Sequence, residues 1–279
     1  MLGILLHLLS PIAASLLYAA LGFHFWRTRW QERGPLAQPL TMQTWERVAI
    51  LGALALQALN LYANLFGEGG MRFSFSLALS LMLWLAVLIY WLESFHSRMD
   101  GLQAMVLPLS AVCAILPVFF PQIRVIEHAN AWGFKLHFIT AMLAYSLFTL
   151  AALHAIFMGF VERKLHQRVL GKHLASLPPI LAMEALLFRM IGIAFVLLTL
   201  ALGSGLLFSE ALFDKALKID HKTLFALASW LIFAALLIGR KVYGWRGRIA
   251  LRWMLTGFLL LFLAYIGSRF VSEVLLGRL

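Results

Sequence analysis

The chain has little of the chemistry on which most enzymes depend. It contains a single cysteine, Cys113, so it can form no internal disulfide and has no CxxC pair, and any thiol chemistry would need a partner. Only 12 of its 279 residues are Asp or Glu. No pair of carboxylates falls inside an apolar segment, which argues against a proton-coupled carrier. HExxH, GxSxG and Walker patterns are also missing, which excludes the metalloprotease, hydrolase and nucleotide sites that they mark.

What the chain has in excess is apolar residues. They make up 62% of the sequence, and the mean hydropathy is +0.89, whereas soluble domains contain about 45–50% apolar residues. The net charge of +11 could suggest nucleic acid. However, the basic residues lie in short connections between apolar runs and form no basic face, so we expect no nucleic-acid partner. Basic loops of this kind are typical of membrane proteins, which makes membrane lipids the expected surroundings.

The apolar residues are grouped in segments that are long enough to cross a bilayer, at roughly 20 residues each. These segments lie near 3–26, 45–66, 73–92, 102–120, 136–160, 187–208, 221–239 and 252–272. We therefore predict an all-α, polytopic helical membrane protein with about eight transmembrane helices. Residues 1–279 are expected to form a single transmembrane domain with two four-span halves, 1–120 and 136–272.

The basic side chains are distributed unevenly between the two ends of this predicted bundle. The connections that follow odd-numbered spans carry most of them: Arg27, Arg29, Arg33, Arg98, Arg163, Lys164, Arg168, Lys172, Arg240, Lys241, Arg246 and Arg248. Because cytoplasmic loops are enriched in Lys and Arg, this distribution predicts that both termini are extracytoplasmic. In the longest of these connections, the apolar stretch 180–187 after Pro178 and Pro179 is expected to lie along the interface as an amphipathic turn.

Two of the predicted spans begin with a histidine. His137 and His221 are separated by one span, so both must emerge on the same face of the membrane, the external one. Two imidazoles at one level can be the axial ligands of a metal or a haem, and the positive end of the helix dipole favours the neutral, ligating form. The alternative is that each histidine is a polar residue at headgroup level. His154, 17 residues or about 25 Å along the helix, cannot share a site with His137.

Four neighbouring residues are candidates for supporting roles. Tyr145 lies on the same helical face as His137 and suits the wall of a flat ligand. Trp132 is either an anchor in the aromatic belt or a platform for a porphyrin. Asp220 could orient an adjacent imidazole or simply cap the seventh helix. His128 is a weaker candidate for a ligand or for a group that supports one.

Several segments resemble the cytochrome c assembly family of membrane proteins, which handle haem. They are LHFITAMLAYSLFTLAALHAIF at 136–157, Phe188–Gly192, Phe195–Leu200, Gly203–Gly205, Asp220–Lys222, Trp230, Tyr243–Arg248 and Leu263–Arg269. The match is most specific over residues 136–272 and weaker over the first four spans. The resemblance implies the fold of that family, a bacterial inner (plasma) membrane location, and a haem-ligand role for His137, which matches the family's external histidine.

The chain departs from the family pattern at three places. Residues 216–219 hold none of the tryptophans of the family's external haem-binding motif, and His221 takes the position of a proline. The family's two further histidines correspond to about Gly239–Arg240 and to a position near Tyr265–Ile266. His221 as the second axial ligand is therefore our inference from topology and is not implied by the resemblance.

These observations predict a haem-binding or haem-handling membrane protein in which His137 and His221 ligate the iron at the external face. Haem is the expected cofactor, and haem-receiving or cytochrome assembly proteins are the expected partners. We predict no catalytic residue. One alternative is a non-enzymatic interaction or regulatory protein that kept the fold and lost haem binding. Another is a transporter for a different small solute, although no broken helix with convergent charges supports it.

Overall fold

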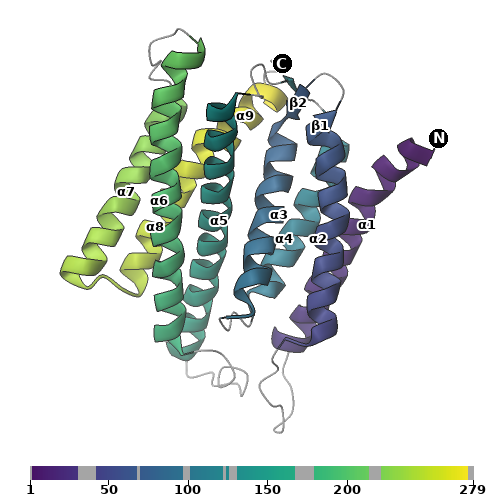
Figure 1. Ribbon diagram of the computed structural model, residues 1–279. Helices are drawn as coiled ribbons and strands as arrows, with labels where there is room; N and C mark the ends of the chain where they lie inside the picture. Colours follow the sequence, from purple (N-terminus) through teal and green to yellow (C-terminus); the bar gives the residue numbers. More distant parts are fainter. Residues whose placement is uncertain are drawn as a thin grey trace.

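The computed structural model describes residues 2–30, 42–67, 70–96, 101–121, 124–125, 131–166, 179–213 and 221–275. Its principal helices are α1 Leu2–Phe25, α2 Thr44–Leu65, α3 Phe75–Glu93, α4 Gln103–Phe119, α5 Trp132–His166, α6 Ile180–Phe213, α7 His221–Tyr243 and α8 Arg248–Phe262. Short helical segments extend two of them: η1 Trp26–Trp30 follows α1, and η3 Leu263–Gly267, α9 Ser268–Phe270 and η4 Val271–Leu275 follow α8. The helices run up and down through one bundle (Figure 1), which confirms the predicted polytopic helical fold.

Seven helices in the described part of the chain are long and apolar enough to cross a membrane. The remaining one, α4, is an apolar helix of 17 residues that contains Pro108 and Pro117. At 1.5 Å per residue it is about 25 Å long, slightly less than a hydrocarbon core of about 30 Å. The eight predicted segments thus correspond to eight helical spans; α4 is the short one, because α8 continues through η3 and α9 to Phe270.

Helices α5 and α6 are longer than predicted, with 35 and 34 residues. The expectation that residues 180–187 lie along the interface is wrong, because they form the first turns of α6. Pro179 directly precedes this helix, where its carbonyl accepts the backbone N–H of Ala182 at 2.9 Å and that of Met183 at 3.1 Å. A proline at this position costs no helical hydrogen bond.

The two ends of the bundle differ in chemistry. We call the end at which α5 and α7 begin the histidine end, and the opposite end the arginine end. Figure 1 shows the start of α5, the start of α7 and both chain termini toward its upper, histidine end. His137 and His221 therefore belong to the same end, as the topology required. Which end faces the cytoplasm stays a prediction.

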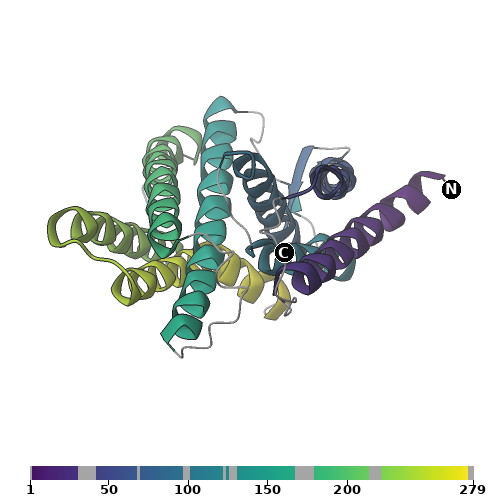
Figure 2. The ribbon, with the colours of Figure 1, turned by 90° about the horizontal axis from the view of Figure 1, so that it is seen from below.

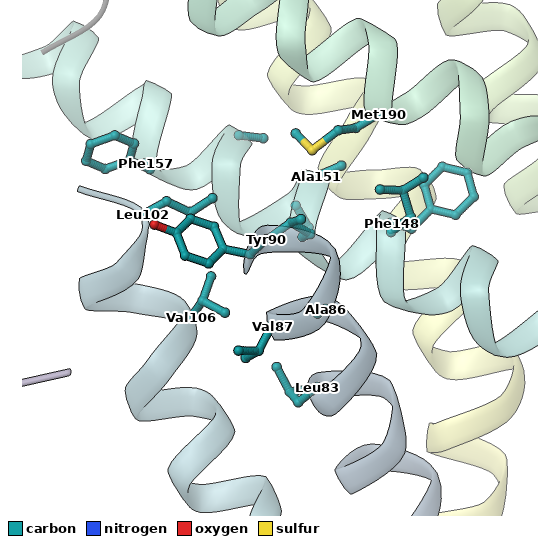
Figure 3. Packing of buried hydrophobic residues seen from close by; sticks show 14 of the residues in the cluster. Leu83, Ala86, Val87, Tyr90, Leu102, Val106, Phe148, Ala151, Phe157 and Met190 are labelled. Carbon is teal, nitrogen blue, oxygen red and sulfur yellow. The ribbon is translucent and has the colours of Figure 1, made fainter. Parts of the chain in front are cut away.

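Helices α1–α4 meet the later helices chiefly where α3 packs against α5, with a smaller contact between α4 and α5. Figure 3 shows Tyr90 of α3 and Phe157 of α5 in this contact, together with Met190 of α6. Gly101, in the turn before α4, has a φ of +95°, and a Cβ there would lie 2.5 Å from Cζ of Phe157. Only glycine meets both requirements without strain, so this turn can lie flat against the phenyl ring.

At the arginine end, glutamates pair with arginines and join different helical elements. The pairs are Glu46–Arg29, Glu93–Arg189, Glu184–Arg240 and Glu162–Arg248. The carboxylates of Glu46 and Glu184 are buried, each with 4% of the side chain exposed. Removing water from such pairs makes the loss of one partner expensive, so they fix the relative positions of the helices at this end.

The histidine end carries a short antiparallel ribbon that the sequence did not predict. Strands β1 Phe66–Gly67, β2 Gly70–Phe73 and β3 Arg124–Val125 pair in the order β1-β2-β3. The last residue of β2, Phe73, is buried and makes an edge-on contact with Phe138 of α5, with ring centroids 5.0 Å apart. The ribbon thereby ties the first half of the chain to the beginning of α5.

Candidate functional site

His137 lies one turn into α5, and its ring is held by α6. Its Nδ1 lies 3.0 Å from the carbonyl oxygen of Ala201 and 3.1 Å from Oγ of Ser204. A carbonyl oxygen can only accept a hydrogen bond, so Nδ1 carries the proton. The Ser204 hydroxyl donates to the same carbonyl at 3.0 Å and can accept from Nδ1–H. The imidazole is thus fixed in one tautomer and one orientation.

A glycine makes this close approach possible. A Cβ placed on Gly205 would lie 3.3 Å from Cε1 of His137 and 3.6 Å from its Nδ1, tighter than ordinary van der Waals contact. Gly205 therefore lets the ring rest against the backbone of α6.

The tautomer leaves Nε2 of His137 with a free lone pair. No hydrogen bond to this atom is found among the described residues, and the side chain is half-buried. Histidines that ligate metals almost always donate the other ring N–H to a carbonyl, a carboxylate or water, which fixes the ring and raises its basicity. His137 has this hydrogen-bonding arrangement, and its Nε2 is the atom that could ligate a metal.

His221 is the first residue of α7 and is exposed. Helices α5 and α7 meet lower in the bundle, where Phe148 and Phe233 stack with centroids 4.0 Å apart. His137 precedes Phe148 by 11 residues and His221 precedes Phe233 by 12, so both histidines lie about 17–18 Å above this stack. No hydrogen bond or ring contact joins the two histidines among the described residues.

The predicted supporting residues have different surroundings. Tyr145 is buried, and its ring centroid lies 6.1 Å from that of Tyr265 in η3. Trp132 is 79% exposed at the first position of α5, which favours an aromatic-belt anchor. Asp220 and His128 lie outside the described residues.

Other side chains that could ligate a metal are scattered through the described residues. No group of three or more His, Cys, Asp or Glu side chains that could hold a bare metal ion occurs in the described part of the chain. A haem iron needs far less from the protein, because the porphyrin supplies four of its ligands.

Comparison with known proteins bears on this site. The family model described as "Cytochrome C assembly protein" matches residues 45–276. The chain belongs to this family. It is 29% identical over 237 residues to the inner membrane protein YpjD of Escherichia coli (strain K12), covering 83% of this chain and 89% of YpjD.

Two further relatives match shorter parts of the chain. An uncharacterized 28.8 kDa protein of Azospirillum brasilense is 35% identical over 144 residues, or 51% of this chain and 52% of that protein. The cytochrome c biogenesis protein CcsA of Prochlorococcus marinus (strain MIT 9301) is 38% identical over 90 residues, or 32% of this chain and 29% of CcsA. No solved structure matches the chain.

One position at which the family resemblance implies a histidine is filled here by a different cluster. A Cβ on Gly239 would lie 2.3 Å from Cε3 of Trp245, so the indole occupies the space beside this glycine. The guanidinium of the next residue, Arg240, donates to Glu184 at 2.5 Å and to the carbonyl of Trp245 at 3.2 Å, and lies 4.7 Å from the Phe188 ring. The polar groups of this cluster bond to one another, and the cluster offers no ligand for an iron.

Sequence reasoning missed one buried polar cluster. Glu46 accepts hydrogen bonds from Arg29 at 3.1 Å and from the backbone N–H of Gln43 at 2.8 Å, and it lies 3.0 Å from Nε2 of His24. His24 and Glu46 are 22 residues apart on different helices, so no spacing rule could pair them. The only signal was an acidic residue beside an apolar run, which must find a partner in a membrane.

Proposed function

We propose that this protein binds haem at the histidine end, with His137 as one axial ligand and His221 as the second. In this proposal it is a haem-handling protein of the bacterial inner membrane that serves cytochrome assembly. The observation that carries it is the hydrogen bond from Nδ1 of His137 to the carbonyl of Ala201, which leaves Nε2 free to ligate. Membership of the cytochrome c assembly family supports the choice of haem over another ligand.

The chain's own residues have defined tasks in this proposal. Ala201 and Ser204 hold the imidazole so that ligation costs little side-chain entropy. The stacked rings of Phe148 and Phe233 join α5 to α7 below the site and limit how far it extends toward the membrane centre. Bound haem would supply a redox-active iron, and the protein would set its ligation and access.

Location and partners are inferred from relatives. YpjD is named an inner membrane protein and CcsA a cytochrome c biogenesis protein. We propose the same membrane for this chain, with both termini outside the cytoplasm as the basic loops predict. Its partners would be proteins that receive haem or assemble cytochromes.

The visible spectrum of protein purified in mild detergent tests the proposal. Wild type is compared with His137→Ala, His221→Ala and the matched control His96→Ala, an exposed histidine at the arginine end. We expect a Soret band with sharp bands after reduction in wild type and in the control, and a much weaker band in both site variants. Loss with His137→Ala alone would keep haem binding and reject His221 as the partner.

A second candidate function is favoured by one observation: the resemblance implies histidines at about Gly239–Arg240 and near Tyr265–Ile266, and the chain has no histidine at either place. In that case the protein has kept the fold, has lost haem and acts as a non-enzymatic interaction or regulatory subunit. A wild type without a Soret band, even after haem is added to the purified protein, would reject haem binding and support this candidate.

A further inference from the structure

The corner where α7 turns into α8 presents three basic side chains that are not neutralised. Lys241 lies in the last turn of α7, Arg246 lies in the turn between the helices and Arg252 is in the second turn of α8, and all three are exposed. No hydrogen bond or ion pair to them is found within the part of the chain that the structure describes. Figure 1 shows this corner at the lower left, and Figure 2 shows it at the margin of the bundle.

The two other basic residues of the corner are already paired. Arg240 is bound to the buried carboxylate of Glu184, and Nε of Arg248 lies 3.4 Å from Oε1 of Glu162. Their charges are largely neutralised by carboxylates of the protein. The positive potential outside the corner therefore comes from Lys241, Arg246 and Arg252.

The turn itself is rigidly built. Gly244 and Gly247 have φ of +65° and +57°, a left-handed conformation that side chains other than glycine rarely adopt. Between them, Trp245 lies against Gly239, and its ring centroid is 5.1 Å from that of Trp253. The basic side chains thus project from a fixed turn, which reduces the entropy lost when they bind a ligand together.

The surroundings of these charges are apolar. Val242 is 64% exposed, Tyr243 is 74% exposed and Ile249 is 50% exposed. Aromatic and aliphatic groups next to basic ones are typical of the membrane interface, where rings lie at headgroup depth. A free phosphate ion would gain nothing from these side chains, whereas a lipid would place its acyl chains against them.

We propose that the α7–α8 corner is a binding site for the headgroup of an anionic phospholipid. Lys241, Arg246 and Arg252 bind the phosphate and any further headgroup oxygens, and arginine is well suited to phosphate because its planar fork can donate two parallel hydrogen bonds. Exposed apolar side chains beside them contact the acyl chains. This site lies at the end opposite to His137 and does not depend on haem binding.

The test uses the full-length protein in a neutral detergent. It is titrated separately with phosphatidylglycerol, phosphatidylcholine and inorganic phosphate, and native mass spectrometry measures the bound fraction. The variant combines Lys241→Gln, Arg246→Gln and Arg252→Gln. At about 1 kcal/mol for each basic side chain near an anionic lipid, its affinity for phosphatidylglycerol should fall roughly a hundredfold.

The matched control removes three exposed basic residues elsewhere at the same end, Arg27, Arg163 and Lys164, each replaced by glutamine. Circular dichroism without added lipid verifies that both variants are folded. We expect the control to keep near-wild-type affinity and wild type to prefer phosphatidylglycerol to phosphatidylcholine. Equal losses in both variants, no preference between the lipids, or equal binding of inorganic phosphate alone would each overturn the proposal.

Discussion

Replacing Glu46 by alanine should be among the most damaging single changes at the arginine end. The side chain of Glu46 is 4% exposed, and that of its partner Arg29 is 7% exposed. The substitution would leave a guanidinium buried without a carboxylate. Breaking a buried ion pair on one side costs about 3–5 kcal/mol, so we expect a loss of that size in the free energy of unfolding.

Other contacts of Glu46 decide where in this range the value falls. Its carboxylate also accepts the backbone N–H of Gln43 at 2.8 Å, so the cap of α2 is lost as well, worth about 1 kcal/mol. In the opposite direction, 31% of the His24 side chain is exposed beside the pair. Water can therefore reach the cluster and lower the free-energy cost of leaving Arg29 without a carboxylate. The two effects oppose each other, and we expect about 4 kcal/mol.

The natural comparison is Glu162→Ala. This substitution breaks the pair with Arg248, whose side chain is 65% exposed, and exposed pairs are worth about 0–1 kcal/mol. Unfolding in mixed micelles, followed by tryptophan fluorescence, measures both variants. A double variant, Arg29→Met with Glu46→Leu, removes both buried charges and should recover most of the loss. Equal costs for the two single variants, or a double variant as unstable as Glu46→Ala, would refute the reasoning.

Three further substitutions test the packing and the site. Gly239→Ala puts a methyl group 2.3 Å from the Trp245 ring and should destabilise by about 1–3 kcal/mol, seen as a lower unfolding midpoint and a changed near-UV spectrum. Gly192→Ala, with no atom within 4 Å of the new methyl group, should leave both unchanged or raise stability slightly. Ser204→Ala removes one of the two acceptors that hold His137 and should weaken haem binding about tenfold in a haem titration, without loss of the fold. An unchanged affinity would mean that the Ala201 carbonyl alone positions the ring.

The transmembrane helices could be predicted because each span appears in the sequence as a run of about 20 mostly apolar residues. Their ends were not, for a physical reason visible at α5. This helix runs through Arg163 and Lys164 to His166, yet hydropathy records where the hydrocarbon ends and not where the backbone hydrogen bonds end. The first two turns of α6, which follow Pro179, were not predicted as part of this helix for the same reason.

The site was predictable only in part. The position of His137 at the start of a span, and its shared end with His221, follow from counting spans. Its acceptors on α6 are 64 and 67 residues away, and no local pattern shows which face of one helix meets which face of another. The same limit applies to His24 and Glu46, whose pairing depends on the crossing of α1 and α2.

The unbroken course of α6 has a mechanical consequence. No proline interrupts it between Ile180 and Phe213, and one rod therefore carries Glu184 near the arginine end and Ser204 beside His137. These residues are 20 positions, or about 30 Å, apart. We expect this continuous helix to couple the two positions, so that breaking the Glu184–Arg240 pair displaces Ser204 and the imidazole of His137. In the proposed haem complex, breaking that pair should therefore change the haem absorbance although none of the proposed ligands is altered.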